Sequence, residues 1–175
     1  MNLDDMKNGG IFGMIQSGKT TLAGKISRYF NSKHARPSIV LDPIKKFDWG
    51  KHSTVFDLNE ESAFWETAWK VTGCLVVVDE SSTTIARDKD LIPVFTRLHH
   101  NNHKILVVCH NKADLLPTMR QQFTNIFLFR QPEESAKIWA SEFTQPGIRD
   151  AERLEQFQFM ACGRYTPPEI FQLTP

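Results

Sequence analysis

The segment Gly13–Thr20 fits the pattern G-x-x-x-x-G-K-[ST] at every fixed position. This spacing forms a loop between a strand and a helix, in which backbone N–H groups surround phosphate oxygens. The flanking residues agree with that context. Apolar residues lead into the loop, and after it they recur at helical spacing: Ile11, Phe12, Met14 and Ile15 before Gln16, and Leu22, Ala23, Ile26, Tyr29 and Phe30 after Thr20. The segment therefore predicts a strand–loop–helix unit that holds a nucleotide phosphate.

The chemistry of such a loop assigns roles to its residues. Lys19 is expected to reach the β- and γ-phosphates, and the Thr20 hydroxyl to bind Mg²⁺. We expect ATP as the nucleotide and Mg²⁺ as its cation. The expected nucleotide-binding residues are Gly13, Gln16, Ser17, Gly18, Lys19, Thr20 and Thr21.

Buried strands and helices are predicted to alternate along most of the chain. Four more apolar runs predict strands, and five segments predict helices. The apolar runs are continuous rather than alternating, which is typical of parallel strands covered on both faces. The pattern predicts an α/β fold with a central, mainly parallel sheet. The predicted strands are Pro37–Leu41, Cys74–Val78, Lys104–Cys109 and Asn125–Phe129; the predicted helices are Lys19–Phe30, Glu60–Lys70, Ile92–His100, Leu115–Phe123 and Pro132–Phe143.

The last segments of the chain carry a weaker pattern. The apolar run Phe157–Cys162 predicts a further strand at the edge of the sheet. The tail from Thr166 to Pro175 contains Pro167 and Pro168, which prevent a regular helix. We therefore expect this tail to be extended.

Overall composition excludes several classes of protein. The chain of 175 residues has 21 basic and 20 acidic residues, so its net charge predicts no partner. Its three cysteines form no CxxC pair, which favours reduced core thiols over a disulfide framework or zinc site. We expect no signal peptide and no membrane-spanning segment, and a cytoplasmic location. Four histidines fit no strong zinc pattern and are expected to be solvated, with DNA-phosphate or subunit contact left open: His99, His100, His103 and His110.

Two adjacent acids follow the predicted strand Cys74–Val78. Asp79 is expected to hold Mg²⁺, and Glu80 to polarise a water for attack on the γ-phosphate. The alternative is an ordinary strand followed by an exposed acidic turn. The preceding phosphate loop favours the catalytic interpretation, because hydrolysing motors need a carboxylate beside the metal ligand.

A second pair of polar residues, His110 and Asn111, follows the strand Lys104–Cys109. In a sheet where this strand neighbours the phosphate-loop strand, its end faces the γ-phosphate. Either side chain can hydrogen-bond the attacking water or the phosphate. The alternative is a solvated turn, and the sequence does not choose between the two residues.

Together these motifs resemble the FtsK–HerA superfamily of P-loop translocases, in particular the genome-packaging ATPases of membrane-containing icosahedral viruses. The resemblance covers about residues 9 to 135. Four features support it: the early phosphate loop, the Asp42-Pro43 turn after the second strand, the Val76–Glu80 segment, and the stretch from Thr96 to His103 before an apolar strand. The segment Asn125–Arg130 is similar to the family's last core strand. The family usually has Gln where this chain has His110-Asn111.

The resemblance implies a fold, a partner and an assembly. The fold is a three-layer P-loop NTPase domain over residues 1–175, with RecA-like strand order 5-1-4-3-2 and a C-terminal extension at 145–175. The activity is ATP-driven translocation of double-stranded DNA into a preformed capsid, in the host cytoplasm or at the packaging vertex, with capsid vertex proteins as partners. ATPases that assemble as rings supply an arginine across the interface. A hexamer is expected here, with Arg97 or Arg87 in that role, and with Lys112 or Lys89 contacting the DNA backbone.

Three alternatives stay open. One is a phage assembly or secretion ATPase that acts on protein, although such proteins usually carry a membrane segment or a large extra domain. Another is a small nucleoside or metabolite kinase, which would need an acceptor pocket and an arginine-rich lid. The last is a nucleotide-binding module without hydrolysis, which the presence of Glu80 disfavours.

Overall fold

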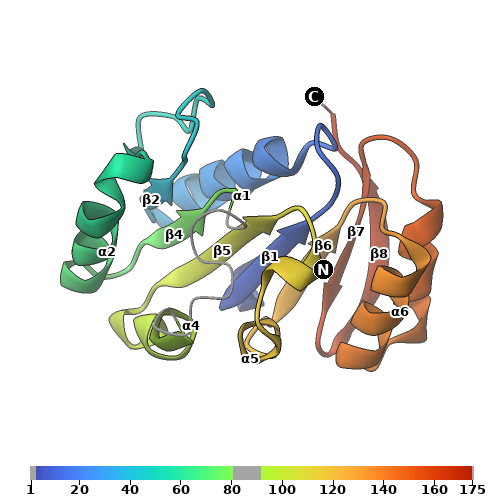
Figure 1. The fold of residues 1–175 in the computed structure, drawn as a ribbon. Coiled ribbons are helices and arrows are strands. Elements are labelled where there is room, and N and C mark those ends of the chain that lie inside the picture. The colour runs from blue at the N-terminus through green and yellow to red at the C-terminus, as the bar shows by residue number, and fades with distance from the viewer. Residues whose placement is uncertain (1–2, 81–91, 175) are drawn as a thin grey trace.

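The computed structural model of the chain describes residues 3–80 and 92–174. Its strands form one sheet of eight in the order β3-β2-β4-β5-β1-β6-β7-β8. The first six in this order pair in parallel, whereas β7 and β8 are antiparallel. Figure 1 shows this sheet between helices on both of its faces. The strands are β1 (Asn8–Phe12), β2 (Ser38–Leu41), β3 (Ser53–Phe56), β4 (Leu75–Val78), β5 (Lys104–Cys109), β6 (Asn125–Leu128), β7 (Gln158–Gly163) and β8 (Thr166–Gln172).

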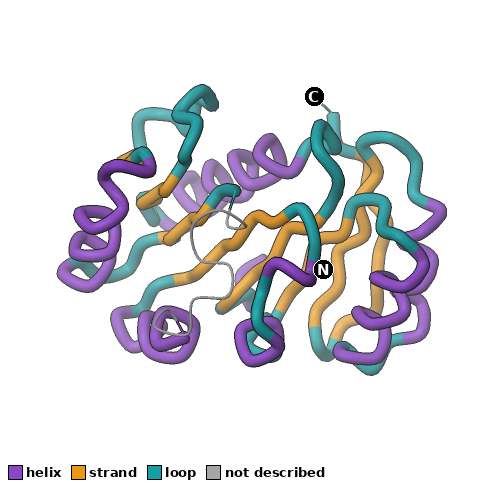
Figure 2. Tube along the Cα trace, in the orientation of Figure 1, coloured by secondary structure: helices purple, strands orange, loops and turns teal. Residues whose placement is uncertain are grey.

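Alternation of side chains along the buried strands creates two cores. In β4, Val76 and Val78 face one core, and Leu75 and Val77 face the other. Helix α1 (Lys19–His34) covers one face, and the other helices cover the opposite face (Figure 2). Those helices are α2 (Glu61–Lys70), α4 (Ile92–Arg97), α5 (Pro117–Arg120) and α6 (Glu133–Glu142), joined by 3₁₀ turns at Leu3–Asp5, Leu58–Glu60, Leu98–Asn101, Lys112–Asp114 and Pro146–Arg153.

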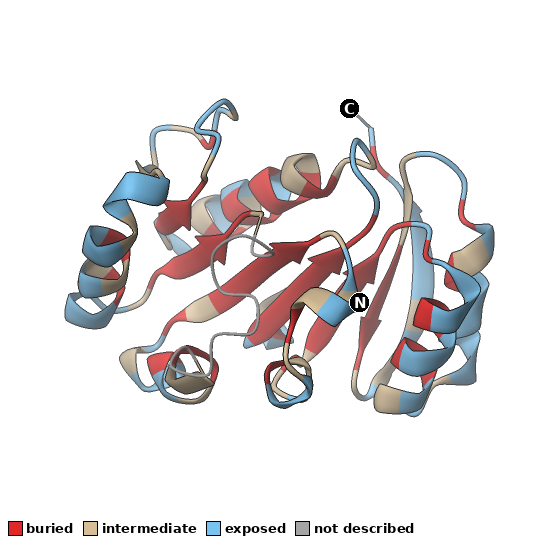
Figure 3. Cartoon of the chain, in the orientation of Figure 1, coloured by how far each residue is buried: buried red, intermediate tan, exposed pale blue. Residues whose placement is uncertain are grey.

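Burial follows this layered arrangement. Figure 3 shows the central strands buried along their length, with exposed residues on the outer surfaces of the helices and on β8. All three cysteines are buried, as predicted for core thiols. The three-layer α/β fold predicted from the sequence is therefore confirmed, including the core strand order, which is β6-β1-β5-β4-β2.

Several elements differ from the sequence predictions. Strand β3 was not predicted, because Ser53–Phe56 is short and only partly buried. The predicted edge strand, β7, is an inner strand, since the proline-containing tail forms the edge strand β8 beyond it. Only Pro117–Arg120 of the predicted helix Leu115–Phe123 is helical. Met14 and Ile15 were expected to belong to the apolar lead-in, yet they are 67% and 75% exposed at the tip of the phosphate loop.

The Asp42-Pro43 turn is held by a buried carboxylate. Asp42 is only 3% exposed. Its Oδ1 accepts hydrogen bonds from the backbone N–H groups of Ile44 and Lys45, at 3.0 and 2.9 Å. Its Oδ2 accepts one from the indole N–H of Trp49 at 3.0 Å. These bonds satisfy the carboxylate and fix the path of the chain after β2.

Substitution of Trp49 tests this arrangement. Trp49→Phe removes the indole donor and leaves a buried carboxylate oxygen with one partner fewer, so the free energy of unfolding should fall by about 1–3 kcal/mol in urea denaturation. Trp65→Phe is the matched control, because the Trp65 indole donates instead to Glu61 on the helix surface. Equal losses in the two variants would mean that the Asp42 bond does not anchor the turn.

Candidate active site

The parallel register brings three separate segments to one edge of the sheet. Phe12 is aligned with Cys109, and Val78 with Val107. The residues that follow these strands, Gly13, Asp79 and His110, therefore leave the sheet at the same edge. This edge is where ligands bind in open parallel sheets.

Close packing determines the shape of the phosphate loop. A Cβ on Gly13 would lie 2.7 Å from the Cβ of Phe129 and 2.8 Å from the hydroxyl of Ser17. Gly18 adopts φ +103°, where only glycine is unstrained, and it caps the N-terminus of α1. The first N–H groups of a helix have no acceptor inside it. The Ser17 hydroxyl is buried and unpaired among the described residues. The loop thus offers donors suited to an anion.

Lys19 is the cation of this loop. It is 7% exposed, and burial lowers the pKa of its ammonium group. Its Nζ donates to the backbone oxygen of Met14 at 2.8 Å and lies 3.2 Å from Nδ1 of His110. The carbonyl of Met14 as a partner of Lys19 was not predicted, because a backbone group carries no sequence signal. The ammonium is held inside the loop, at the position expected for a phosphate contact.

Thr20 and Asp79 meet beside Lys19. The Thr20 hydroxyl donates to Oδ2 of Asp79 at 2.9 Å, although the two residues lie on α1 and after β4. Asp79 is 3% exposed, and burial raises its pKa to about 6. A hydroxyl and a carboxylate are the oxygen ligands that Mg²⁺ prefers. A buried carboxylate is also stabilised by a nearby cation. The pair therefore fits the predicted Mg²⁺ site.

His110 joins the lysine to the second acid. Its Nδ1 faces Nζ of Lys19, and its Nε2 lies 3.1 Å from Oε2 of Glu80. Because the ammonium group can only donate, Nδ1 acts as the acceptor and Nε2 carries the proton donated to Glu80. Glu80 itself adopts φ +49°, a strained conformation for a residue with a side chain. The structure thus brings Lys19, His110 and Glu80 into one hydrogen-bonded chain.

Asn111 lies outside this chain. Its side chain accepts a hydrogen bond from the N–H of Ala113 at 3.2 Å, and its N–H donates to Asp114 at 2.9 Å. These contacts cap the 3₁₀ turn Lys112–Asp114. Of the two residues considered for the end of β5, the structure places His110 toward the site and uses Asn111 as a cap.

A cavity of about 290 Å³ opens between the loop on one side and Glu80 and His110 on the other. Five of the residues expected to bind the nucleotide line it together with Ile15, Glu80, His110 and Phe157; the five are Gln16, Gly18, Lys19, Thr20 and Thr21. Phe157 was missed because it lies beyond the motifs that carry the sequence resemblance. Phe157 reaches the cavity because it directly precedes β7, which pairs with β6.

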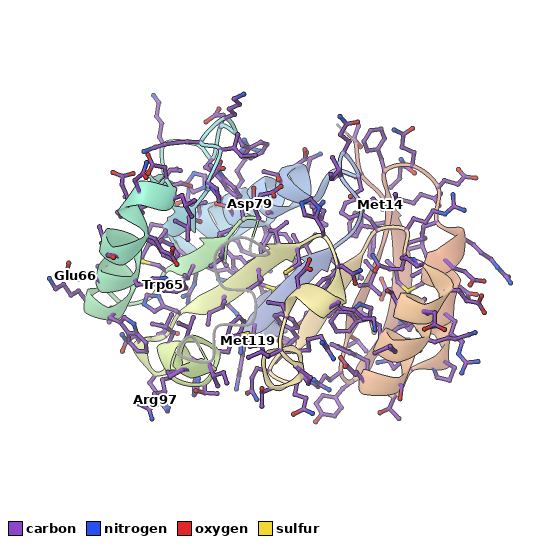
Figure 4. The ribbon with its side chains drawn as sticks, in the orientation of Figure 1. Met14, Trp65, Glu66, Asp79, Arg97 and Met119 are labelled. Atoms are coloured by element: carbon purple, nitrogen blue, oxygen red, sulfur yellow. The ribbon has the colours of Figure 1, made fainter. Side chains whose placement is uncertain are left out.

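Arg97, one of the two predicted arginines, does not line this cavity. Arg97 ends α4, is exposed, and lies at the end of the sheet opposite Asp79 and Met14 (Figure 4). It cannot reach the phosphate loop of its own chain. Arg87 and Lys89 lie outside the described residues. Lys112 is partly buried in the 3₁₀ turn after β5.

The histidines near β5 have separate environments. His99 and His100 are exposed, as expected. His103 is 4% exposed, so the expectation that it is solvated is wrong. Its Nδ1 accepts from the N–H of Cys74 at 3.0 Å, and its Nε2 lies 2.9 Å from the carbonyl oxygen of Ala68. His103 therefore ties α2 to β4, a tertiary role that sequence spacing does not reveal.

No helix within residues 3–80 and 92–174 is long and apolar enough to cross a membrane. In the same ranges, no group of three or more His, Cys, Asp or Glu residues is arranged to hold a metal ion by itself.

The burial of Asp79 generates a test. Asp79→Asn removes a charge that is costly in this buried position at pH 7.5. The amide oxygen can still accept from the N–H of Glu80, as Oδ1 of Asp79 does at 3.0 Å, and the amino group can donate to the Thr20 hydroxyl oxygen. In the absence of metal and nucleotide, the melting temperature should rise by a few degrees. Asp5→Asn, at an exposed carboxyl in the 3₁₀ turn Leu3–Asp5, should leave it unchanged. A melting temperature for Asp79→Asn at or below that of the wild type would mean that the buried charge of Asp79 does not destabilise the protein.

Comparison with known proteins gives a clear result at the level of the fold. No protein-family model matches the chain, and neither does any curated protein sequence. Among solved structures, the genome packaging NTPase B204 from Sulfolobus turreted icosahedral virus 2, in complex with ATP-gammaS, superposes with a TM-score of 0.81 at 15% identity, covering 98% of each chain. Its sulfate complex gives 0.80 at 17% identity, covering 99% of each chain. The cytoplasmic domain of the type VII secretion ATPase EccC from Thermomonospora curvata gives 0.68 at 13% identity, covering 95% of this chain and 25% of that domain.

These similarities extend over nearly all of the chain, including the β7–β8 region that the sequence motifs did not match. The resemblance predicted from the phosphate loop, the Asp42-Pro43 turn and the Asp79-Glu80 pair is confirmed in the architecture. The chain has the P-loop NTPase fold of the B204 genome-packaging NTPase.

Proposed function

We propose that this protein is an ATP-hydrolysing motor that translocates double-stranded DNA, and that it packages a viral genome into a preformed capsid. The observation that carries the proposal is the hydrogen-bonded chain Lys19–His110–Glu80 beside the Thr20–Asp79 pair. These groups supply a phosphate contact, a polar residue at the sensor position, a general base and a metal site at one edge of the sheet.

The proposed chemistry uses the groups where they lie. Lys19 and the loop N–H groups bind the β- and γ-phosphates of ATP. The Glu80 carboxylate accepts a proton as water attacks the γ-phosphorus, and the bond from the γ-phosphorus to the bridging oxygen of ADP breaks. His110 contacts both Lys19 and Glu80, so it orients the base relative to the phosphate. Thr20 and Asp79 would hold Mg²⁺, which neutralises phosphate charge when bound.

A ring assembly completes the proposal. The cavity is open to solvent beside Met14 and Ile15, whose exposed apolar side chains suit coverage by a neighbouring subunit. Arg97 lies far from its own site, which is consistent with action on the site of a neighbour, with Arg87 as the second candidate. A hexamer is our proposed ring. We also propose that the whole chain is one ATPase domain, since all eight strands belong to one sheet.

The DNA assignment is drawn from the fold comparison. B204 is described as a genome packaging NTPase, and its structures contain ATP-gammaS, AMPPCP and AMP. We extend this role to the present chain, with sequence-independent contacts to the DNA backbone by residues such as Lys112 or Lys89. The motor would act in the host cytoplasm or at the capsid vertex, together with vertex proteins.

A second candidate function is transport of protein rather than DNA. The similarity to the cytoplasmic domain of the secretion ATPase EccC favours it, but that match has a lower TM-score and covers a quarter of that domain. The B204 structures match this chain over almost their full length. We therefore place DNA translocation first.

The proposal is tested by ATP hydrolysis with and without double-stranded DNA. Phosphate release should increase when DNA is added, and the increase should diminish as salt rises, because backbone contacts displace counterions. Equal rates at every DNA and salt concentration, with no retention of DNA by the ATP-bound protein, would contradict translocation. Transfer of phosphate to a nucleoside, rather than its release, would identify a kinase.

Replacement of the proposed base gives a sharper test of the chemistry. Glu80→Gln keeps the size of the side chain but removes proton acceptance, so kcat should fall about 100-fold or more while ATP still binds. The control is Glu66→Gln on the outer surface of α2, which should leave kcat unchanged. Wild-type turnover by the Glu80 variant would overturn the assignment.

The role of His110 is separable from that of its neighbour. His110→Ala removes the group between Lys19 and Glu80, so kcat should fall about tenfold or more with a small change in KM. Asn111→Ala affects only the cap of the 3₁₀ turn and should keep kcat within about twofold. The reverse pattern, measured in the same hydrolysis assay, would place Asn111 rather than His110 at the reaction.

A further inference from the structure

We propose that Phe157 is the stacking surface for the nucleobase of the bound nucleotide. This inference rests on the proposed function, because it assumes that the phosphate loop holds a nucleoside triphosphate. It assigns a binding role to a residue between the 3₁₀ turn Pro146–Arg153 and β7, in the part of the chain without recognised motifs.

The sheet order sets the direction of the nucleotide. The loop follows β1, which lies between β5 on one side and β6, then β7, on the other. Glu80 and His110, at the ends of β4 and β5, lie on the first side. A triphosphate with its γ-phosphate toward those residues therefore extends its α-phosphate and base toward the β7 side. Phe157 immediately precedes β7 and lines the same cavity.

Phe157 is fixed against the loop. Its carbonyl accepts a hydrogen bond from the N–H of Leu173 at 2.8 Å, and its φ is +60°. Leu173 packs so closely on the loop that a Cβ on Gly18 would lie 2.7 Å from it, and 3.5 Å from Cδ1 of Phe157. Lys25 on α1 also donates to the carbonyl of Thr174. Figure 1 shows the segment that follows β8 near the loop, in agreement with the contact between Leu173 and Gly18. These contacts fix the backbone that carries the aromatic ring beside the loop.

Phe157 stands between two cavities of about 290 Å³ each. Ile15, Gln16 and Phe157 line both of them. The second continues over Leu154 and Gln156. A base that leaves the phosphate loop on this side meets the Phe157 ring in either cavity. The ring is only partly buried, so part of its surface is available for contact.

Aromatic stacking accepts every base, because every base has a π-face. The ligand class is therefore a nucleoside triphosphate bound mainly through phosphates and stacking. Purine nucleotides should bind more tightly than pyrimidine nucleotides, since their larger rings cover more of the phenylalanine.

The test compares two ligands by calorimetry in the presence of Mg²⁺: ATP, which has a base, and inorganic tripolyphosphate, which has none. Phe157→Ala should weaken ATP binding about tenfold or more and leave tripolyphosphate binding unchanged. Phe157→Tyr should bind ATP like the wild type. Phe157→Leu keeps apolar bulk without a π-face, so it should lose ATP affinity while retaining the fold. Phe171→Ala is the control, because this aromatic residue of β8 lines neither cavity.

Three outcomes would overturn the inference, each for a different reason. Equal losses for ATP and tripolyphosphate would mean that Phe157 supports the shape of the loop rather than the base. Unchanged ATP affinity in both Phe157→Ala and Phe157→Leu would mean that the base binds elsewhere. A wild-type protein that binds neither ligand would remove the proposed function itself, and the base site with it.

Discussion

The register of the parallel strands is the constraint on which the site depends. Because β1, β4 and β5 end at one edge of the sheet, Gly13, Asp79 and His110 converge although they are far apart in the sequence. A shift of one residue in this pairing would turn each strand's side chains to the other face. The two faces pack against different sets of side chains, so such a shift would place each strand residue in a core packed for another. The hydrophobic core therefore sets the geometry of the polar site.

The site keeps two charged groups in a buried position. Burial opposes the charge on both Lys19 and Asp79, lowering the pKa of the first and raising that of the second. Their hydrogen bonds to Met14, His110 and Thr20 offset part of that cost. Triphosphate and a divalent cation would offset the rest, since each brings the opposite charge. The two buried charges therefore suit a ligand that combines phosphate groups with a divalent cation.

Features set by local sequence could be predicted, whereas features that depend on tertiary contacts could not. The phosphate loop, the Asp79-Glu80 pair and the core strands follow from spacing and hydrophobic pattern, and the strand order follows from the family resemblance. The choice between His110 and Asn111 could not be made, because it depends on which side chain caps the next turn. The burial of His103 and the position of Phe157 depend on contacts with distant strands. Strand β3 and the edge position of β8 were missed because both are only partly buried.

Every role proposed for a residue of the site depends on the orientation of the bound nucleotide. A crystal structure with Mg²⁺ and a non-hydrolysable ATP analogue measures it directly. We predict the γ-phosphate beside Lys19, Glu80 and His110, the cation at Thr20 and Asp79, and the base against Phe157. A triphosphate bound in the reverse direction, or outside the loop Gly13–Thr20, would contradict the central claim that this edge of the sheet is an ATP-hydrolysing site.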